Sequence, residues 1–232
     1  MTTWLDTTKR QLFELRFDML APGRAIADLR AWHLDSAPGR AAAGVPAPEG
    51  VWTVRLGSRG PGLVTLTRWP SLTDRQAALG AWLDTPAARG QLWDGARGLI
   101  RDAESWILID SPAGAGRVGP ATVAGGLHEM RLYRALNGSV AEAAQALADH
   151  DLAAAQEAGA QPTGLYEIAI GPERPLIAAT FAWPPGVLPA DVWLALDARA
   201  DTGARRLAER ARHRRRLIGL VEPILLQPVE AP

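Results

Sequence analysis

Strict alternation of apolar and polar residues predicts a half-buried strand near the start of the chain. Residues 11–18, QLFELRFD, place apolar side chains on one face and Glu14, Arg16 and Asp18 on the other. We therefore expect apolar packing on one side of this strand and a row of charged groups on its other side.

The next hundred residues continue with a defined order of helices and strands. A helix is predicted after the Pro-Gly pair at 22–23, because Ile26, Leu29 and His33 follow at helical spacing. Capping-type sequences and apolar runs then predict, in order, a strand at 51–56, a strand at 63–69, a helix from Ser71, a helix from Thr85 to Ile100 and a closing strand at 106–109.

The chain contains an internal repeat, which a self-comparison shows at four places in the same order. The offsets between the paired segments are nearly constant, at 115, 114, 114 and 118 residues. The pairs are LFELRF at 12–17 with LHEMRL at 127–132, GVWTVRLG at 50–57 with GLYEIAIG at 164–171, WP at 69–70 with WP at 183–184, and ESWIL at 104–108 with EPILL at 222–226.

The repeat divides the chain into a first module at 10–111, a Pro/Gly-rich linker at 112–125 and a second module at 126–228. Each module has the order βαββαβ, which is typical of the ferredoxin-like arrangement. Such a sheet carries helices on one face only, so its other face needs a partner. We therefore predict an α+β protein in which two fused ferredoxin-like modules close an intramolecular α/β barrel.

Composition excludes several classes of function. Twenty-five basic residues balance 25 acidic ones, which does not favour nucleic acid or an anionic membrane as a partner. There is no cysteine, and no histidine spacing is typical of a metal site, so we expect no metal and no cofactor. With no signal peptide and no membrane-spanning apolar run, we expect a cytoplasmic monomer or homodimer.

Several of these segments resemble NIPSNAP-domain proteins, within the dimeric α/β-barrel superfamily that also holds the antibiotic-biosynthesis monooxygenases. The resemblance covers most of residues 11–110 and more weakly residues 126–228. It implies a barrel with a cavity, and its wider relatives include cofactor-independent oxygenases, haem-degrading enzymes, isomerases and carriers. The matching residues are Glu14-Leu15-Arg16, Pro22-Gly23, Gly50-Val51-Trp52-Thr53, Trp69-Pro70-Ser71-Leu72 and Arg75.

Two residues are predicted to be catalytic. His33 lies where its helix meets the sheet, so its imidazole is placed to transfer protons near neutral pH; the alternative is a core histidine bonded to a carbonyl or to Asp35. Arg75 lies between Leu72 and Leu79 on the apolar face of its helix. It would neutralise an anionic intermediate, or else extend its head group into water.

The first module is rich in tryptophan, and the second is not. The second also replaces Trp52 with Tyr166 and Arg68 with Ala182, although two copies under equal structural demands should keep equal core residues. This asymmetry predicts one pocket for a small apolar or aromatic metabolite between helix and sheet of the first module, although aromatic core packing is an alternative. The predicted substrate-binding residues are Trp52, Arg68, Trp69, Trp82 and Trp93.

The charged pair Glu14 and Arg16 recurs as Glu129 and Arg131. We expect these residues to face the barrel interior and to exchange partners between modules, Glu14 with Arg131 and Glu129 with Arg16. Such a buried ion network would fix how the modules dock.

Three functions fit these residues. The first is a cofactor-independent oxygenase, cyclase or isomerase acting on a largely apolar metabolite in bacterial specialised metabolism. The second is a non-catalytic ligand-binding or scaffold protein. Haem binding through His33 is the third.

Overall fold

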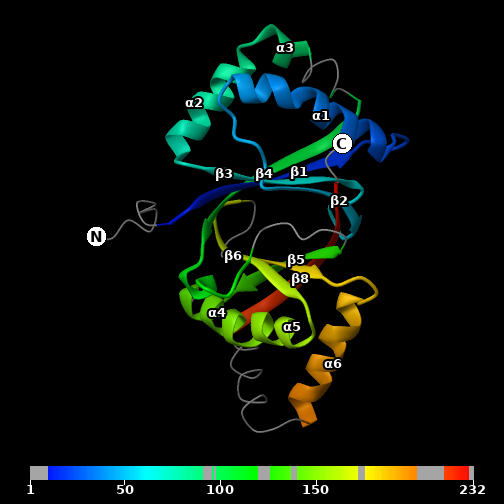
Figure 1. Cartoon of the computed structure of the whole chain (residues 1–232), viewed down its shortest axis with the longest axis vertical. Coiled ribbons are helices and arrows are strands. Elements are labelled where there is room, and N and C mark those ends of the chain that lie inside the picture. The colour runs from blue at the N-terminus through cyan, green and yellow to red at the C-terminus, as the bar shows by residue number, and fades with distance from the viewer. Residues whose placement is uncertain are drawn as a thin grey trace.

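A computed structural model describes residues 10–90, 96, 98–119, 126–136, 140–171, 176–202 and 217–229. Its centre is a closed eight-stranded antiparallel barrel (Figure 1). The strands are β1 (Leu12–Leu20), β2 (Gly50–Leu56), β3 (Gly62–Trp69), β4 (Ile100–Asp110), β5 (Leu127–Ala135), β6 (Gln161–Ile170), β7 (Leu176–Trp183) and β8 (Ile218–Pro228).

The strands follow the order β1-β3-β2-β8-β5-β7-β6-β4, and β4 closes the ring on β1. Residues 10–119, the first half, therefore contribute four neighbouring strands, β4-β1-β3-β2, and residues 126–229, the second half, contribute β8-β5-β7-β6. The halves join through β2 with β8 and through β4 with β6. Closure leaves no free sheet edge, so the barrel satisfies its backbone hydrogen bonds internally.

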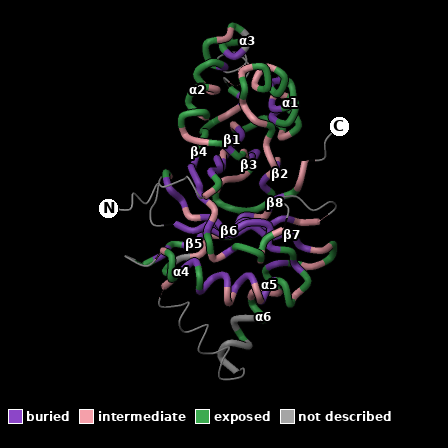
Figure 2. The backbone as a smooth tube through the Cα atoms, turned by 60° about the vertical axis from the view of Figure 1, so that its left-hand side comes forward, coloured by how far each residue is buried: buried purple, intermediate pink, exposed green. Residues whose placement is uncertain are grey.

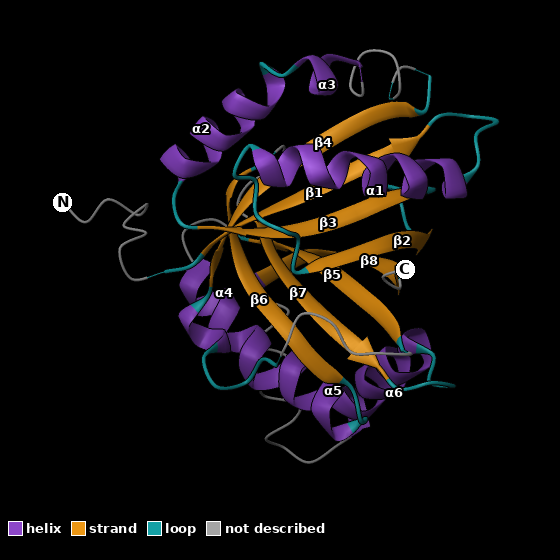
Figure 3. Ribbon diagram, turned by 45° about the horizontal axis from the view of Figure 1, so that its top comes forward, coloured by secondary structure: helices purple, strands orange, loops and turns teal. Residues whose placement is uncertain are grey.

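Helices cover the outside of the barrel on opposite sides (Figure 3). Those of the first half lie over β1, β3 and β4, and those of the second half lie below β5, β6 and β7 (Figure 1). The helices over the first half are α1 (Ile26–Ala42), α2 (Leu72–Leu83) and α3 (Pro86–Arg89). Those of the second half are α4 (Val140–Leu147), the π-helical turn η4 (Ala148–Leu152), α5 (Ala153–Glu157) and α6 (Pro189–Thr202), and the short 3₁₀ turn η3 (Pro112–Gly114) packs against α4 and β6.

The barrel interior is apolar and is filled from both halves. Phe13, Leu15 and Phe17 of β1 point inward and join one cluster with side chains of the second half, such as Met130 and Ile224. Buried positions are concentrated in the strands, whereas the helices of the first half are largely exposed (Figure 2). The interior is therefore a packed core, and the charged face of β1 must point the other way, toward the helices.

The helical layers of the two halves are packed differently. In the second half, alanines such as Ala144, Ala148 and Ala155 are completely buried and bring α4 and α5 close to the sheet, within one continuous apolar cluster. In the first half, the apolar side chains form two separate clusters, one around Trp69 and one around Leu29. The charged face of β1 lies under this divided layer.

Most predicted elements are confirmed, with one difference at the end of the first half. The Ser71 hydroxyl accepts a hydrogen bond from the Asp74 N–H, and the Thr85 hydroxyl accepts one from Ala88. The helix that we expected to run to Ile100 ends earlier, because Ile100 already begins β4. Among the described residues, no helix is both long and apolar enough to span a bilayer.

Candidate functional site

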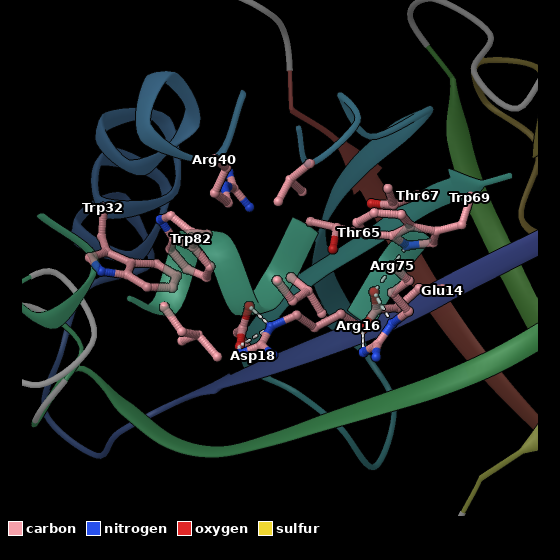
Figure 4. Close-up of a pocket in the computed structure, with 13 residues that line it drawn as sticks. Glu14, Arg16, Asp18, Trp32, Arg40, Thr65, Thr67, Trp69, Arg75 and Trp82 are labelled. Carbon is pink, nitrogen blue, oxygen red and sulfur yellow. Dashed lines mark hydrogen bonds and ion pairs between the residues drawn. The ribbon is translucent and has the colours of Figure 1, made fainter. Parts of the chain in front are cut away.

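A pocket of about 180 Å³ lies between the helices and the outer face of the sheet in the first half (Figure 4). Strands β1 and β3 form its floor, and α1 and α2 form its walls. Its volume is only slightly larger than that of a cavity known to hold benzene, about 150 Å³. The lining residues are Glu14, Arg16, Asp18, Trp32, Arg40, Val45, Thr65, Thr67, Trp69, Arg75, Leu79, Trp82 and Leu83.

One end of the pocket is aromatic. Trp32 of α1 and Trp82 of α2 line that end, away from the sheet residues Thr67 and Trp69 (Figure 4). Trp82 is 8% exposed. Indole side chains from two different helices therefore line this end, which suits an aromatic ring.

The opposite end is an ion pair tied to an indole. The Arg75 Nε donates to Glu14 Oε2 at 2.9 Å, its Nη2 donates to Oε1, and the Trp69 Nε1 donates to Oε2 at 3.1 Å. Burial would raise the pKa of the Glu14 carboxyl, but the hydrogen bonds and charge of Arg75 outweigh it, so this pKa is lowered. Glu14 is therefore ionised at neutral pH, and Arg75 has its charge compensated.

A second ion pair lies on the floor, and an extra cation faces it. Arg16 contacts Asp18 through Nε at 3.0 Å and through Nη2 at 2.7 Å. Arg40, near the end of α1, projects from the opposite wall (Figure 4). Its Nη2 donates to the His33 carbonyl at 2.9 Å.

His33 supports Arg40 instead of lining the pocket. Its ring nitrogens Nδ1 and Nε2 lie 3.3 and 3.4 Å from Arg40 Nη2, and the residue is 5% exposed. Burial, followed by the charges of Arg40 and Arg16, lowers the pKa of His33 to about 4. A neutral imidazole with so low a pKa is a weak base, so the expected proton-transfer role has little physical basis.

The other predicted site residues are divided between places. Trp69, Arg75 and Trp82 line the pocket. Trp52 instead faces the barrel interior, where its ring lies 5.8 Å from that of His128. The Arg68 side chain is 55% exposed and pairs with Glu49. Trp93 lies outside the described residues.

The expected exchange of charged partners between halves is wrong. Glu14 pairs with Arg75 and Arg16 with Asp18, while Arg131 lies 3.8 Å from Glu129 in its own half. The reason is the orientation of the strands: the apolar faces meet inside the barrel, and the charged faces turn outward beneath separate helical layers. The two charged networks therefore lie on opposite sides of the barrel.

The corresponding place in the second half is occupied by aromatic side chains. Glu129 Oε2 accepts from the indole N–H of Trp183 at 3.1 Å and from that of Trp193 at 2.8 Å, so Trp193 takes the position that Arg75 has at Glu14. The Arg131 guanidinium stacks 4.0 Å from the Trp193 ring centre. Burial raises the pKa of Glu129, and the opposing charge of Arg131 does not offset it.

Nearby, a buried hydrogen-bonded chain crosses the second half. The Tyr133 hydroxyl donates to Asp151 Oδ2 at 2.8 Å, and Asp151 Oδ1 lies 2.9 Å from His150 Nδ1.

Within the described ranges, no group of three or more histidine, aspartate or glutamate residues is arranged to hold a metal ion.

Eight of the thirteen lining residues were not predicted as site residues, and the charged or aromatic ones among them are Asp18, Trp32 and Arg40. Asp18 and Arg40 each had a signal in the sequence. Asp18 lies two residues beyond Arg16, hence on the same strand face. Arg40 lies seven residues beyond His33, which places the two side chains on one face of α1, two turns apart.

Comparisons with known proteins identify the fold. No family model matches the sequence, and no curated protein matches it. An anthrone oxidase-like protein matches with a TM-score of 0.60 and 15% identity, over 95% of this chain and 92% of that chain. A provisionally named monooxygenase from Fusobacterium nucleatum subsp. nucleatum matches with a TM-score of 0.54 and 9% identity, over 95% and 93%.

A mutant chlorite dismutase from Candidatus Nitrospira defluvii matches with a TM-score of 0.52 and 14% identity, over 94% of this chain and 92% of that chain. All three matches run along almost the whole chain. The protein therefore has the fold of the dimeric α/β-barrel proteins, here formed by one chain.

Proposed function

We propose that the first half binds a small, flat aromatic metabolite in the pocket between its helices and sheet, and oxygenates it without a cofactor. The observation that carries this proposal is the pocket itself, with an aromatic wall of Trp32 and Trp82 opposite paired charges. Its volume suits one aromatic ring, which restricts the largely apolar metabolite expected from the sequence to a small one.

Oxygenation is favoured over cyclisation and isomerisation for two reasons. Two of the structures with this fold are named for oxidase or monooxygenase activity. In addition, neither Glu14 in the pocket nor His33 behind Arg40 is tuned as a general base: Glu14 is held as an ion by Arg75, and the pKa of His33 is lowered to about 4. Such a site suits a substrate that ionises without a strong general base and that itself supplies the electrons that O₂ accepts.

Oxidation of a phenol to a para-quinone meets this requirement, and its atoms and electrons balance with O₂ alone. A carbon–oxygen bond forms at the ring carbon opposite the hydroxyl, while the C–H bond there, the O–H bond and the O–O bond break. One oxygen atom becomes the new carbonyl, and the other leaves as water with the two hydrogens. The substrate gives up all four electrons that O₂ accepts.

We also propose that the barrel consists of two tandem copies of one ferredoxin-like module, of the NIPSNAP type, divided near residues 112–125. The same strand order in each half and the sequence repeat support this division. In this account only the first copy keeps a ligand pocket, because Trp193 fills the place of Arg75 in the second.

The test is oxygen uptake by the purified protein with a panel of one-ring phenols, together with ¹⁸O incorporation from labelled O₂. Wild type should incorporate one labelled atom per quinone, and Leu79→Trp, which fills the pocket, should abolish turnover. Leu194→Trp is the matched control, because Leu194 is 69% exposed on α6.

Binding of the phenols without oxygen uptake would refute oxygenation and favour the non-catalytic ligand-binding alternative. Haem binding through His33 is less favoured, because both ring nitrogens face Arg40 at 3.3–3.4 Å. A Soret band that is lost in His33→Gln would reverse that ranking.

A further inference from the structure

Of the three arginines that line the pocket, Arg40 is the one that forms no ion pair with a described carboxylate. Arg16 and Arg75 each form an ion pair, with Asp18 and Glu14 respectively. Among the described residues, Arg40 has no carboxylate within ion-pairing distance; it donates instead to the His33 carbonyl. Because a guanidinium stays protonated in proteins, this charge persists in the pocket wall.

The charges around Arg40 come from three elements, and they leave one positive charge in excess. Strand β1 contributes Glu14, Arg16 and Asp18, and α2 contributes Arg75. Helix α1 contributes Arg40 itself and a neutral His33. Three guanidiniums therefore face two carboxylates. Burial lowers the pKa of Arg40, the carboxylate charge of Asp18 raises it in part, and the nearby charge of Arg16 lowers it again. Burial prevails, so the positive charge is held at some electrostatic cost.

The position of Arg40 suits recognition of an acidic oxygen on a ring. It is held from behind by His33, which fixes one nitrogen and leaves the rest of the planar fork to bind an oxygen anion. Trp32 and Trp82 lie at the same end of the pocket, and the hydroxyls of Thr65 and Thr67 lie on the floor (Figure 4).

We propose that Arg40 selects the ligand by its charge: the pocket takes a one-ring aromatic monoanion, with its anionic oxygen on the Arg40 guanidinium and its ring against Trp32 and Trp82. This inference rests on the proposed ligand pocket and adds the ionic class of the ligand. For a phenol, binding as the phenolate also loads the ring with the electron density that reaction with O₂ requires. His33 is then a positioning residue that orients Arg40.

The probe is 4-nitrophenol, whose absorption changes on ionisation. Titration of the bound probe in wild type should give a pKa lower than that of the free probe by about one pH unit, because an opposite charge within about 4–6 Å favours the ionised form by at least this much. The ionised probe should then bind about tenfold more tightly than the neutral one. Arg40→Gln should remove the shift, and Arg40→Lys should restore part of it.

Arg30→Gln is the matched control, since Arg30 lies on the same helix but is exposed, and it should leave the shift unchanged. A bound probe with an unshifted pKa, or with the same shift in Arg40→Gln, would overturn the inference and leave the pocket intact. If wild type binds neither the probe nor its neutral counterpart 4-nitroanisole, the pocket itself is wrong, and the inference fails with it. Comparison of the two probes on wild type shows whether the pocket prefers an anionic ligand, even if Arg40→Gln fails to fold.

Discussion

Replacing Glu14 with Gln should destabilise the protein far more than the same change at Glu129, although the two residues are paired in the repeat that we infer from the sequence. Glu14 accepts from Arg75 with both oxygens and from Trp69 with Oε2. A glutamine has one acceptor oxygen, so its amide would face an arginine nitrogen that also donates. At Glu129, both indole N–H groups bond to Oε2 alone, and one amide oxygen can accept from both.

The size of each change in the free energy of unfolding follows from how deeply the charged groups are buried. Breaking a buried ion pair costs about 3–5 kcal/mol, but the Arg75 side chain is 23% exposed and gains water when its partner is lost. We therefore expect Glu14→Gln to lower the free energy of unfolding by about 2–3 kcal/mol at pH 7. The Arg131 guanidinium lies 3.8 Å from Glu129 Oε1, too far for a hydrogen bond, and its charge does not offset the burial that raises the pKa of Glu129. The negative charge of Glu129 is therefore unfavourable in the fold, and Glu129→Gln should change stability by less than about 1 kcal/mol in either direction.

The contributions of Glu14 and Glu129 to stability should also depend on pH in opposite directions. The pKa of Glu14 is lowered, so its contribution is complete above the ordinary glutamate range and is lost as pH falls through the folded-state value. The pKa of Glu129 is raised, so the stability that it contributes is present at acid pH and is lost as pH rises through the folded-state value. Urea unfolding of wild type and both variants from pH 3 to 8 measures both trends. Equal losses in the two variants at pH 7 would refute the reasoning.

Two further predictions concern His33 and the barrel core. Because the pKa of His33 falls from 6.5 to about 4 on folding, the neutral imidazole should contribute roughly 3 kcal/mol of stability, which is complete above pH 6.5 and is lost as pH falls toward 4. His33→Gln should therefore make the stability less dependent on pH in the acid range. A pKa of His33 above 6, measured by NMR titration, would contradict this. Leu15→Ala, fully buried inside the barrel, should cost about 2–5 kcal/mol in urea unfolding, whereas Leu194→Ala should cost less than about 0.5 kcal/mol; similar losses would show that the interior is not packed.

Much of the fold was predictable because its strands alternate in polarity. Residues 11–18 identified β1, and the repeat placed β5 and the other equivalent strands. Which face of β1 would turn inward was not predictable in this way. Both faces are buried, with Leu15 at 0% exposure inside the barrel and Asp18 at 2% beneath the helices, and alternation alone does not tell the two kinds of burial apart.

The candidate site was only partly predictable for a related reason. Trp69, Arg75 and Trp82 were expected in a pocket of the first half and line it. Trp52 was placed on the wrong side of the sheet, because its helix-facing or barrel-facing orientation depends on the register between β2 and β3. Arg40 was missed because it stands out only by having no ion-pair partner among the described carboxylates. The spacing of residues along the chain does not predict which arginine lacks such a partner.

The central claim is that the ligand site lies between the helices and the sheet of the first half. Intermolecular nuclear Overhauser effects between the ring protons of bound 4-nitrophenol and assigned methyl groups of the protein test it most directly. The account predicts contacts to Val45, Leu79 and Leu83, which line the pocket. Contacts instead to Leu15 and Ile224 inside the barrel, or to methyl groups of the second half, would contradict it.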